Sequence, residues 1–491
     1  MTTEAAGPVG PAGTAGVAPV TALAEPQELV GRGWVGRVTL AGLGVWAGFF
    51  GPIQVLLAQQ AEAVAPGDKE LVFGLVTGLG SAVSVVANPL FGALSDRTTS
   101  RFGRRVPWVL GGAVVGALAL LVLAVADSVA LMVVGWCLAQ AALNAMYAAL
   151  TATVPDLVPV RQRGVVGGWV AVSQTLGIVG GVGIATATGG LTAGYVATAT
   201  AVVVLAAPYL WRSGDVPLPK ALRPAWSTAA FLRGFWLSPR EYPDFAWAWL
   251  TRFLVNLGNA MGTLLLYFYL DDAVGYDDPE AGVFVLTVVY AVFIVASTVV
   301  SGLWSDRLRR RKVFVIVAGV VTGAAALVLA LVPTWTGALI GAVVLGIGYG
   351  VYLSVDFALC TEVLPDAESR AKDLGVINIA NALPQVFAPF LGAFLIAQAG
   401  GYVTLYVVAA AVCVLGSVLV TRIRSVAGRC GLVPNRKNPA ADRAVFDQSM
   451  GCSTGQPRVS VTVRLPTLSR KSRSITARRS GPLLSTTNDV E

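Results

Sequence analysis

Long runs of apolar residues alternate along the chain with short polar segments. Each run is about 20 residues long, the length that an α-helix needs to cross the ~30 Å hydrocarbon core of a bilayer. Because the runs have no polar face for water, a soluble helical core does not account for them. We predict an all-α polytopic membrane protein with twelve transmembrane helices, at residues 38–59, 71–93, 107–126, 129–152, 165–187, 193–211, 245–270, 282–303, 313–333, 336–360, 374–398 and 402–421.

The predicted helices divide into two sets of six that repeat the same short motifs. GALSDR (92–97) follows the second helix, and GLWSDR (302–307) follows the eighth. VPDLVP (154–159) follows the fourth helix, and TEVLPD (361–366) follows the tenth. Two parallel six-helix repeats are typical of secondary transporters whose substrate site lies between the halves. The predicted segments are a disordered cytoplasmic N-terminus (1–33), an N-terminal half (34–211), a cytoplasmic linker (212–244), a C-terminal half (245–424) and a disordered basic cytoplasmic tail (425–491).

Charge is distributed unevenly between the two ends of the predicted helices, with a net charge of +8. Apart from Lys69 and Arg252, every Lys and Arg lies in the N-terminal segment, an even-numbered loop or the tail. By contrast, the odd-numbered loop DDAVGYDDPE (271–280) has five carboxylates and no cation. Basic loops stay in the cytoplasm, so we expect an integral plasma (inner) membrane protein with both termini cytoplasmic. No basic patch is interleaved with aromatic residues, which argues against nucleic-acid binding.

Several function classes need residues that this chain does not contain. It has no His, which argues against His-dependent catalytic triads, imidazole metal sites and histidine proton relays. Its five Cys are scattered without metal-ligand spacing, and no G-x-x-x-x-G-K-[ST] motif provides an ATP site. We therefore expect no metal, no cofactor and no enzymatic activity, with an ion gradient as the energy source.

A compact basic stretch, SDRTTSRFGRRVP (95–107), separates the second and third predicted helices. It resembles the signature loop of the major facilitator superfamily, and a reduced copy occurs in the second half. We expect Asp96 to pair with arginines of the turn and to cap the next helix. These contacts would form a conformational latch, present in one arrangement of the halves and broken in the other; the alternative is a segment that only fixes topology. The latch residues are Gly92, Asp96, Arg97, Gly103, Arg104 and Arg105, with Gly302, Asp306 and Arg307 in the second copy.

The insertion of Thr-Thr-Ser-Arg-Phe before Gly-Arg-Arg makes the resemblance more specific. It is similar to the sucrose/proton symporters and to the related glycoside–pentoside–hexuronide cation symporters. The resemblance covers residues 35–424 and implies twelve helices, of which the first, fourth, seventh and tenth line the cavity. Sodium-coupled members of the sugar group use acidic residues in the first two helices, whereas 38–59 and 71–93 contain no carboxylate. We therefore expect coupling to protons rather than to sodium.

Only two charged residues lie deep within the predicted helices, Arg252 and Asp356. Charges in hydrocarbon are costly, so those that are retained there are candidates for function. From the cytoplasmic side the two lie about 12 and 15 Å deep by helical rise, which favours an ion pair between them. The alternatives are that Arg252 extends to the interface and that Asp356 lies near the end of a longer helix. In a chain without His, Asp356 is the expected proton carrier.

Uncharged polar residues recur at helical spacing on four of the predicted helices, so each set lies on one helical face. Amides match sugar hydroxyls, and aromatic rings pack on the faces of sugar rings, so these sets suit a neutral hydroxylated solute. The alternative is hydrogen bonding between helices, and for Asn378, Asn381 and Gln385 the two interpretations are equally favoured. The candidate substrate-binding and coupling residues are Arg252, Asp356, Asn256, Asn259, Tyr349, Tyr352, Gln140, Asn144, Tyr147, Gln54 and Trp46.

These features predict a secondary active transporter that moves a small polar solute by alternating access. The expected transport is proton symport of a sugar or glycoside. One alternative is a facilitator-family exporter of another small molecule, and a remote one is a non-transporting receptor or scaffold. The expected partners are the solute and the lipid bilayer, and the chain is expected to be a monomer.

The predicted orientation is tested by reporter fusions. A reporter fused after Gly275, within the acidic loop, should be active only outside the membrane, because no cation holds this loop in the cytoplasm. One fused after residue 225, within the linker, should report the cytoplasm. Phosphatase and fluorescent-protein fusions at both sites measure this, and the reverse pattern would contradict the predicted number of helices.

Overall fold

The computed structural model describes residues 26–223, 227–228, 239–308, 311–362 and 370–423 of the 491-residue chain. The predicted disordered tail lies outside the described residues, as does most of the predicted N-terminal segment. All the helices described below belong to one compact unit, Met1–Gly428.

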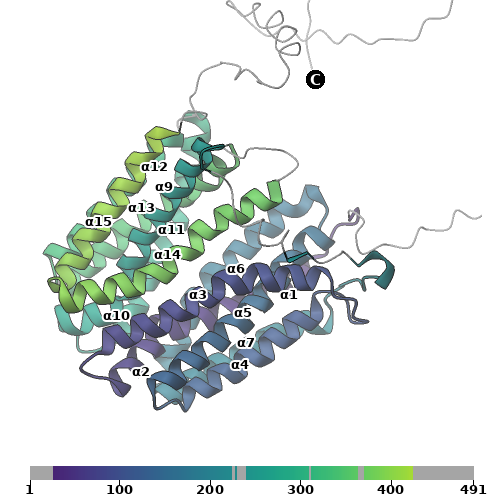
Figure 1. Ribbon diagram of the computed structural model, residues 1–491, viewed down its shortest axis with the longest axis horizontal. Helices are drawn as coiled ribbons and strands as arrows, with labels where there is room; N and C mark the ends of the chain where they lie inside the picture. The colour runs from purple at the N-terminus through teal and green to yellow at the C-terminus, as the bar shows by residue number, and fades with distance from the viewer. Residues whose placement is uncertain (1–25, 224–226, 229–238, 309–310, 363–369, 424–491) are drawn as a thin grey trace, which may run out of the picture. The chain divides into compact units, whose positions relative to one another are not determined.

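Helices make up both predicted halves (Figure 1). The N-terminal half consists of α1 (Arg32–Gly51), the π-helical turn η1 (Pro52–Leu56), α2 (Leu57–Val64), α3 (Lys69–Asp96), α4 (Val106–Ala124), α5 (Val129–Leu157), α6 (Val160–Ala187) and α7 (Leu191–Trp211). The described part of the linker includes the 3₁₀ turn η2 (Lys220–Leu222). The C-terminal half consists of α9 (Pro243–Leu264), α10 (Leu266–Phe268), the π-helical turn η3 (Tyr269–Val274), α11 (Pro279–Leu308), α12 (Arg311–Leu331), α13 (Trp335–Glu362), α14 (Arg370–Gln398), α15 (Gly401–Leu419) and the 3₁₀ turn η4 (Val420–Arg422).

The number of membrane-spanning helices agrees with the sequence. In the described residues, 11 helices are long and apolar enough to cross a membrane, and a bent pair, Pro243–Leu264 with Leu266–Val274, makes up to 12. The predicted all-α polytopic fold is therefore confirmed, and in the described residues the helical segments follow the predicted ones closely.

The residues predicted to cross the membrane, 38–59 and 71–93, contain no carboxylate, but the helices that include them are longer. The first span continues through α2 to Val64 and includes Glu62, and α3 begins at Lys69 and includes Glu70. Polar residues are tolerated at these ends because a helix that leaves the hydrocarbon can expose its side chains to water. The apolar runs thus located the membrane core but underestimated helix length.

The two halves repeat the same packing. In the first, α1 packs against α6 and α7, while α5 packs against α3 and α4. In the second, α9 packs against α14 and α15, while α13 packs against α11 and α12. Each pair has its counterpart six helices later, as the duplicated motifs predicted. Between the halves, α3 packs against α14 and α6 packs against α11.

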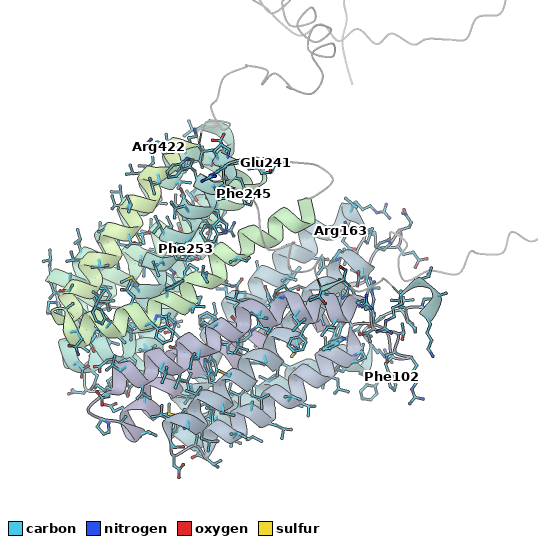
Figure 2. All side chains as sticks on the ribbon, viewed as in Figure 1. Phe102, Arg163, Glu241, Phe245, Phe253 and Arg422 are labelled. Atoms are coloured by element: carbon cyan, nitrogen blue, oxygen red, sulfur yellow. The ribbon has the colours of Figure 1, made fainter. Side chains whose placement is uncertain are left out.

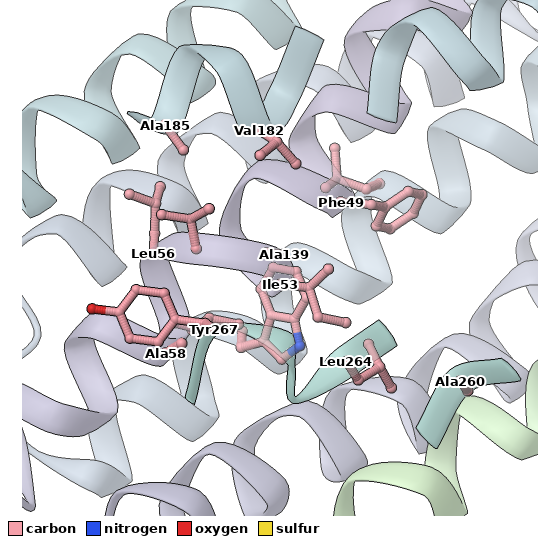
Figure 3. Close-up of a cluster of buried hydrophobic side chains, with 14 of the residues drawn as sticks. Phe49, Ile53, Leu56, Ala58, Ala139, Val182, Ala185, Ala260, Leu264 and Tyr267 are labelled. Carbon is pink, nitrogen blue, oxygen red and sulfur yellow. The ribbon is translucent and has the colours of Figure 1, made fainter. Parts of the chain in front are cut away.

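We call the end of the helices that carries Lys69 and Asp271 the acidic end, and the end that carries Arg105 the basic end. Near the acidic end the halves share a cluster of buried apolar side chains, which includes Ile53 and Leu264 (Figure 3). A second cluster, which includes Phe245 (labelled in Figure 2), consists only of residues of the C-terminal half. The shared cluster joins the halves at the acidic end.

Small residues allow this close approach between the halves. A Cβ on Gly74 of α3 would lie 2.9 Å from the carbonyl oxygen of Pro389 on α14. A Cβ on Gly183 of α6 would lie 3.1 Å from the ring of Phe284 on α11. Both contacts lie in the parts of these helices nearest the acidic end. Glycine therefore permits the close crossing of helices from different halves, most strictly at Gly74, where the contact is with backbone.

Candidate functional site

The predicted ion pair between Arg252 and Asp356 is present. Nη1 of Arg252 on α9 lies 2.9 Å from Oδ2 of Asp356 on α13. Both residues are buried, with 8% and 5% of their surfaces exposed. Helix α13 continues past Asp356 to Glu362, so the carboxylate lies within the helix. The pairing is therefore confirmed, and the two alternatives, an arginine that extends to the interface and an aspartate at a helix end, do not describe these residues.

Neutral polar groups complete the surroundings of the pair. The hydroxyl of Tyr352 donates to Oδ1 of Asp356 at 2.7 Å. Nε of Arg252 donates to Oδ1 of Asn381 on α14 at 2.7 Å. Both carboxylate oxygens therefore have a donor, and the guanidinium has a neutral acceptor besides its anion. A buried ion pair is tolerated only when such hydrogen bonds compensate for the water that both charges have lost.

The network continues from Asn381 along α9 and α13. Nδ2 of Asn256 donates to Oδ1 of Asn381 at 3.1 Å and to the carbonyl of Arg252 at 2.8 Å. The hydroxyl of Tyr349 donates to Oδ1 of Asn256 at 2.9 Å. The ring of Tyr349 stacks on that of Tyr352, with their centroids 5.8 Å apart. These bonds fix the amide orientations, so the side chains around the ion pair are held in one arrangement.

Asn259, one turn further along α9, belongs to a second contact. Its Oδ1 accepts a hydrogen bond of 3.0 Å from the hydroxyl of Tyr290 on α11. The ring of Tyr290 stacks on Tyr349 at a centroid distance of 6.4 Å. Four helices, α9, α11, α13 and α14, thus contribute to one polar region in the C-terminal half.

The candidate residues of the N-terminal half form a separate group. Nδ2 of Asn144 donates to Oε1 of Gln140 at 3.2 Å, and Nδ2 of Asn88 donates to Oδ1 of Asn144 at 3.4 Å. The rings of Trp46 and Tyr147 meet edge to face, with centroids 5.2 Å apart, and both residues are only partly buried. Gln54, also a predicted site residue, is buried within the π-helical turn η1.

The structure therefore separates the predicted residues into two sets, one in each half. The set in the C-terminal half contains both charges, and the set in the N-terminal half consists of amides and aromatic rings. Three participants were not among the candidates: Asn381, Tyr290 and Asn88. Asn381 lay in a polar stripe that fitted helix packing equally well. Tyr290 is a single phenol in a helix without Asn or Gln, which gives no periodic signal. The side chain of Asn378 lies outside the described residues.

The signature loop also has the predicted pairing. Nη2 of Arg105 lies 2.5 Å from Oδ1 of Asp96, and Nε of Arg105 lies 2.8 Å from Oδ2 of Asp156. Arg104 lies 2.5 Å from Oδ1 of Asp156. Burial lowers the pKa of Arg105, but its contacts with Asp156 and Asp96 more than offset this and raise it overall, so the group stays charged. Asp156 comes from the duplicated VPDLVP motif, which explains why this motif accompanies the loop.

The predicted cap on the next helix was assigned to the wrong residue. Oδ2 of Asp215, in the linker, accepts hydrogen bonds from the backbone N–H groups of Arg105 (2.6 Å) and Val106 (3.0 Å) at the start of α4. Asp96 instead lies at the end of α3 and uses its carboxylate for Arg105. Gly103 has φ of 100°, and a Cβ there would overlap the same Asp215 oxygen. Glycine is required both for this backbone conformation and for the approach of the linker.

The remaining latch residues are placed only in part. Arg97 directly follows α3. A Cβ on Gly92 would lie 3.9 Å from Ala148 on α5, and one on Gly302 would lie 3.9 Å from Ser354 on α13, the equivalent helix of the second half. The side chains of Asp306 and Arg307 lie outside the described residues. The loop contacts given above lie within the N-terminal half and the linker.

The chain matches the Major Facilitator Superfamily over residues 38–288 and 253–444, and it belongs to this family. Two curated relatives match short segments. Lactose permease of Lactobacillus delbrueckii subsp. bulgaricus is 43% identical over 60 residues, 12% of this chain and 9% of the permease. An uncharacterized symporter of Synechocystis sp. is 51% identical over 39 residues, 8% of this chain and 7% of the symporter. The chain thus spans less than a tenth of each of these relatives.

Solved structures share the fold at low sequence identity. A POT family transporter in complex with a thioalcohol-conjugated peptide has a TM-score of 0.64 and 12% identity, over 79% of this chain and 95% of that one. The nucleoside transporter NupG has a TM-score of 0.62 and 12% identity, over 79% of this chain and 98% of the other. The chain therefore has the major facilitator fold.

The ion pair leads to a prediction about stability. Arg252→Ala and Asp356→Ala should each lower the thermal unfolding midpoint strongly, because breaking a buried pair leaves one uncompensated charge and costs about 3–5 kcal/mol. The double change should cost less than the sum of the two single changes, since no lone charge remains. Unfolding of the purified protein, followed by tryptophan fluorescence, measures this. If the decrease in the unfolding midpoint of the double variant equals the sum of the two single decreases, the two charges do not stabilise each other.

Proposed function

We propose that this transporter carries a small neutral hydroxylated solute, a sugar or glycoside, together with a proton. The observation that carries the proposal is the buried ion pair of Arg252 and Asp356 within a network of amides and phenols. An ionised carboxylate at this depth is tolerated only with its partner, and a protonated one needs no partner. Asp356 thus has two states that differ by one proton, and in the protonated state the buried guanidinium of Arg252 needs another acceptor in place of its anion.

Protonation of Asp356 would change how Arg252 is held. The attraction between the guanidinium of Arg252 on α9 and the carboxylate of Asp356 on α13 disappears. The hydrogen bond from Nε of Arg252 to Asn381 does not depend on the charge of Asp356. The guanidinium is then able to donate to a solute hydroxyl. Proton and solute binding support each other because each favours the same arrangement of Arg252, and such coupling is reciprocal. This is the linkage that a symporter needs.

The N-terminal half supplies groups that suit the rest of a sugar. The partly buried rings of Trp46 and Tyr147 offer apolar faces, and Gln140 and Asn144 offer amide donors and acceptors. Sugars combine apolar ring faces with hydroxyl rims, so aromatic rings and amides match them. The name of one short-segment relative, lactose permease, is in keeping with this substrate class.

We further propose that the basic end faces the cytoplasm, since basic loops are retained there. The shared apolar cluster joins the halves near the acidic end, which corresponds to an arrangement closed to the outside. The contacts of Asp96, Asp156 and Asp215 around Arg105 then belong to the cytoplasmic side, where a conformational latch would act.

The coupling role of Asp356 is tested by Asp356→Asn. The amide mimics the protonated carboxyl and cannot release a proton. We expect accumulation driven by an imposed pH gradient to fall to the level of simple equilibration, while exchange of labelled solute across the membrane continues. The measurement uses proteoliposomes and a panel of mono- and disaccharides, from which the solute is first chosen by thermal stabilisation of the purified protein.

The matched control is Asp277→Asn, which removes an exposed carboxylate outside the helices and should accumulate solute at the wild-type level. Wild-type accumulation by Asp356→Asn would contradict the coupling role. Wild-type uptake that ignores the pH gradient would indicate a facilitator without proton coupling, and uptake only into inside-out vesicles would indicate an exporter.

A further inference from the structure

A cluster of charged residues joins the two halves at the acidic end, centred on Lys69. Nζ of this residue lies 2.8 Å from Oδ2 of Asp271 and 2.8 Å from Oδ1 of Asp272, both in the C-terminal half. It also lies 3.1 Å from Oε1 of Glu62 in its own half. The hydroxyl of Tyr402 on α15 donates to the other oxygen of Asp272 at 2.6 Å. We call these five residues the Lys69 cluster.

The local backbone explains how one ammonium reaches two neighbouring carboxylates. Helix α9 ends at Leu264, and the chain bends by 44° before the next helical segment, Leu266–Val274. That segment ends in the π-helical turn η3, which contains Asp271 and Asp272. π-helical turns are rare and occur often at functional sites. The bend and the wide turn present both carboxylates to Lys69 at the start of α3.

Lys69 is the exception in the charge pattern of the sequence, because it is the single cation placed in an odd-numbered loop. Its side chain is only 12% exposed. Nearby, the rings of Phe73 on α3 and Phe268 on α10 meet edge to face, with centroids 5.4 Å apart. The charged cluster and this aromatic contact both join the N-terminal to the C-terminal half at the acidic end.

We propose that the Lys69 cluster is an ionic lock that holds the acidic end closed and must come apart for that end to open. Opening moves η3 away from α3, so Lys69 keeps Glu62 but loses Asp271 and Asp272. The two aspartates are then left next to each other with no cation between them. Their repulsion and the loss of two ion pairs raise the free energy of the open arrangement. The lock depends on neither the solute nor the coupling ion, so it goes beyond the proposed function.

The ion pairs of the Lys69 cluster favour the closed over the open arrangement of the acidic end, but not so strongly that this end cannot open. The side chains of Glu62, Asp271 and Asp272 are 38%, 35% and 32% exposed, so water and salt screen each pair. Several pairs that share one cation shift a two-state equilibrium by about tenfold rather than by many orders of magnitude. The bias should therefore fall as ionic strength rises.

Spin-label distances test the lock without any solute. Labels are placed by Gly67→Cys, in the exposed turn before α3, and Asp277→Cys, in the exposed turn before α11, with the five native cysteines replaced. A Cβ on Gly67 would meet nothing within 4 Å, so the label fits there. Pulsed electron resonance in lipid nanodiscs then gives the distance between the halves at the acidic end. With Lys69 present we expect a short distance to dominate. Lys69→Gln should increase the longer-distance population about tenfold, whereas Lys69→Arg should keep the short distance.

Two further comparisons separate a lock from a structural role. The charge swap Lys69→Asp with Asp272→Lys should recover much of the short distance that Lys69→Asp alone loses. High salt should shift the Lys69 protein toward the longer distance and have little effect on Lys69→Gln. The matched control is Lys312→Gln, because Lys312 donates to the carbonyl of Ile423 within the C-terminal half and should not affect the acidic end.

Tyr402→Phe provides a milder variant that is expected to fold. It removes one hydrogen bond to Asp272 and should give a smaller shift in the same direction. The proposal is overturned if Lys69→Gln and Lys69→Asp, both monodisperse, show the same distances as the Lys69 protein. It is also overturned if the charge swap gives no recovery. Either result leaves the coupling role of Asp356 untouched, because that role is read from accumulation and not from this distance.

Discussion

The energetic cost of a charge in hydrocarbon is the constraint on which the rest of the C-terminal half depends. Arg252 and Asp356 are both buried, and each is tolerated because the other is 2.9 Å away. Tyr352 donates to the second carboxylate oxygen of Asp356, and Nε of Arg252 donates to Asn381, so polar atoms that the ion pair does not use also have partners. The helices α9, α13 and α14 are therefore held together by polar contacts as well as by packing, and any change in the charge of Asp356 affects all three.

The two halves contribute different chemical groups to the polar regions. The C-terminal half holds the two charges, and the N-terminal half offers amides and aromatic rings around Trp46 and Tyr147. Helix α14 carries Asn381 and also packs against α3 of the other half. The region around Asp356 is thus connected through α14 to the surface along which the halves meet. This set of contacts is the route by which the proposed proton symport would link the protonation state of Asp356 to movement of the halves.

The sequence predicted the features that follow from solvation. Apolar length identified the spans, and the similar depths of Arg252 and Asp356 predicted their pairing, because a charge in hydrocarbon is costly without a partner. Features that depend on tertiary contact were not predictable. Asp215 caps α4 from an irregular linker, and an irregular segment has no periodic pattern from which this cap could be predicted. Asn381 and Tyr290 are neutral, and a neutral polar side chain on one helix does not identify its partner on another.

Solute-induced current is the most direct test of the central claim, that a proton moves with the solute through Asp356. A neutral sugar carries no charge, so any current that follows its addition to proteoliposomes on a supported membrane reports the co-transported ion. The account predicts an inward current that grows as the outer solution is acidified, does not need sodium, and is absent from Asp356→Asn although that variant still exchanges solute. A current of wild-type size in Asp356→Asn, or one that requires sodium, would contradict it.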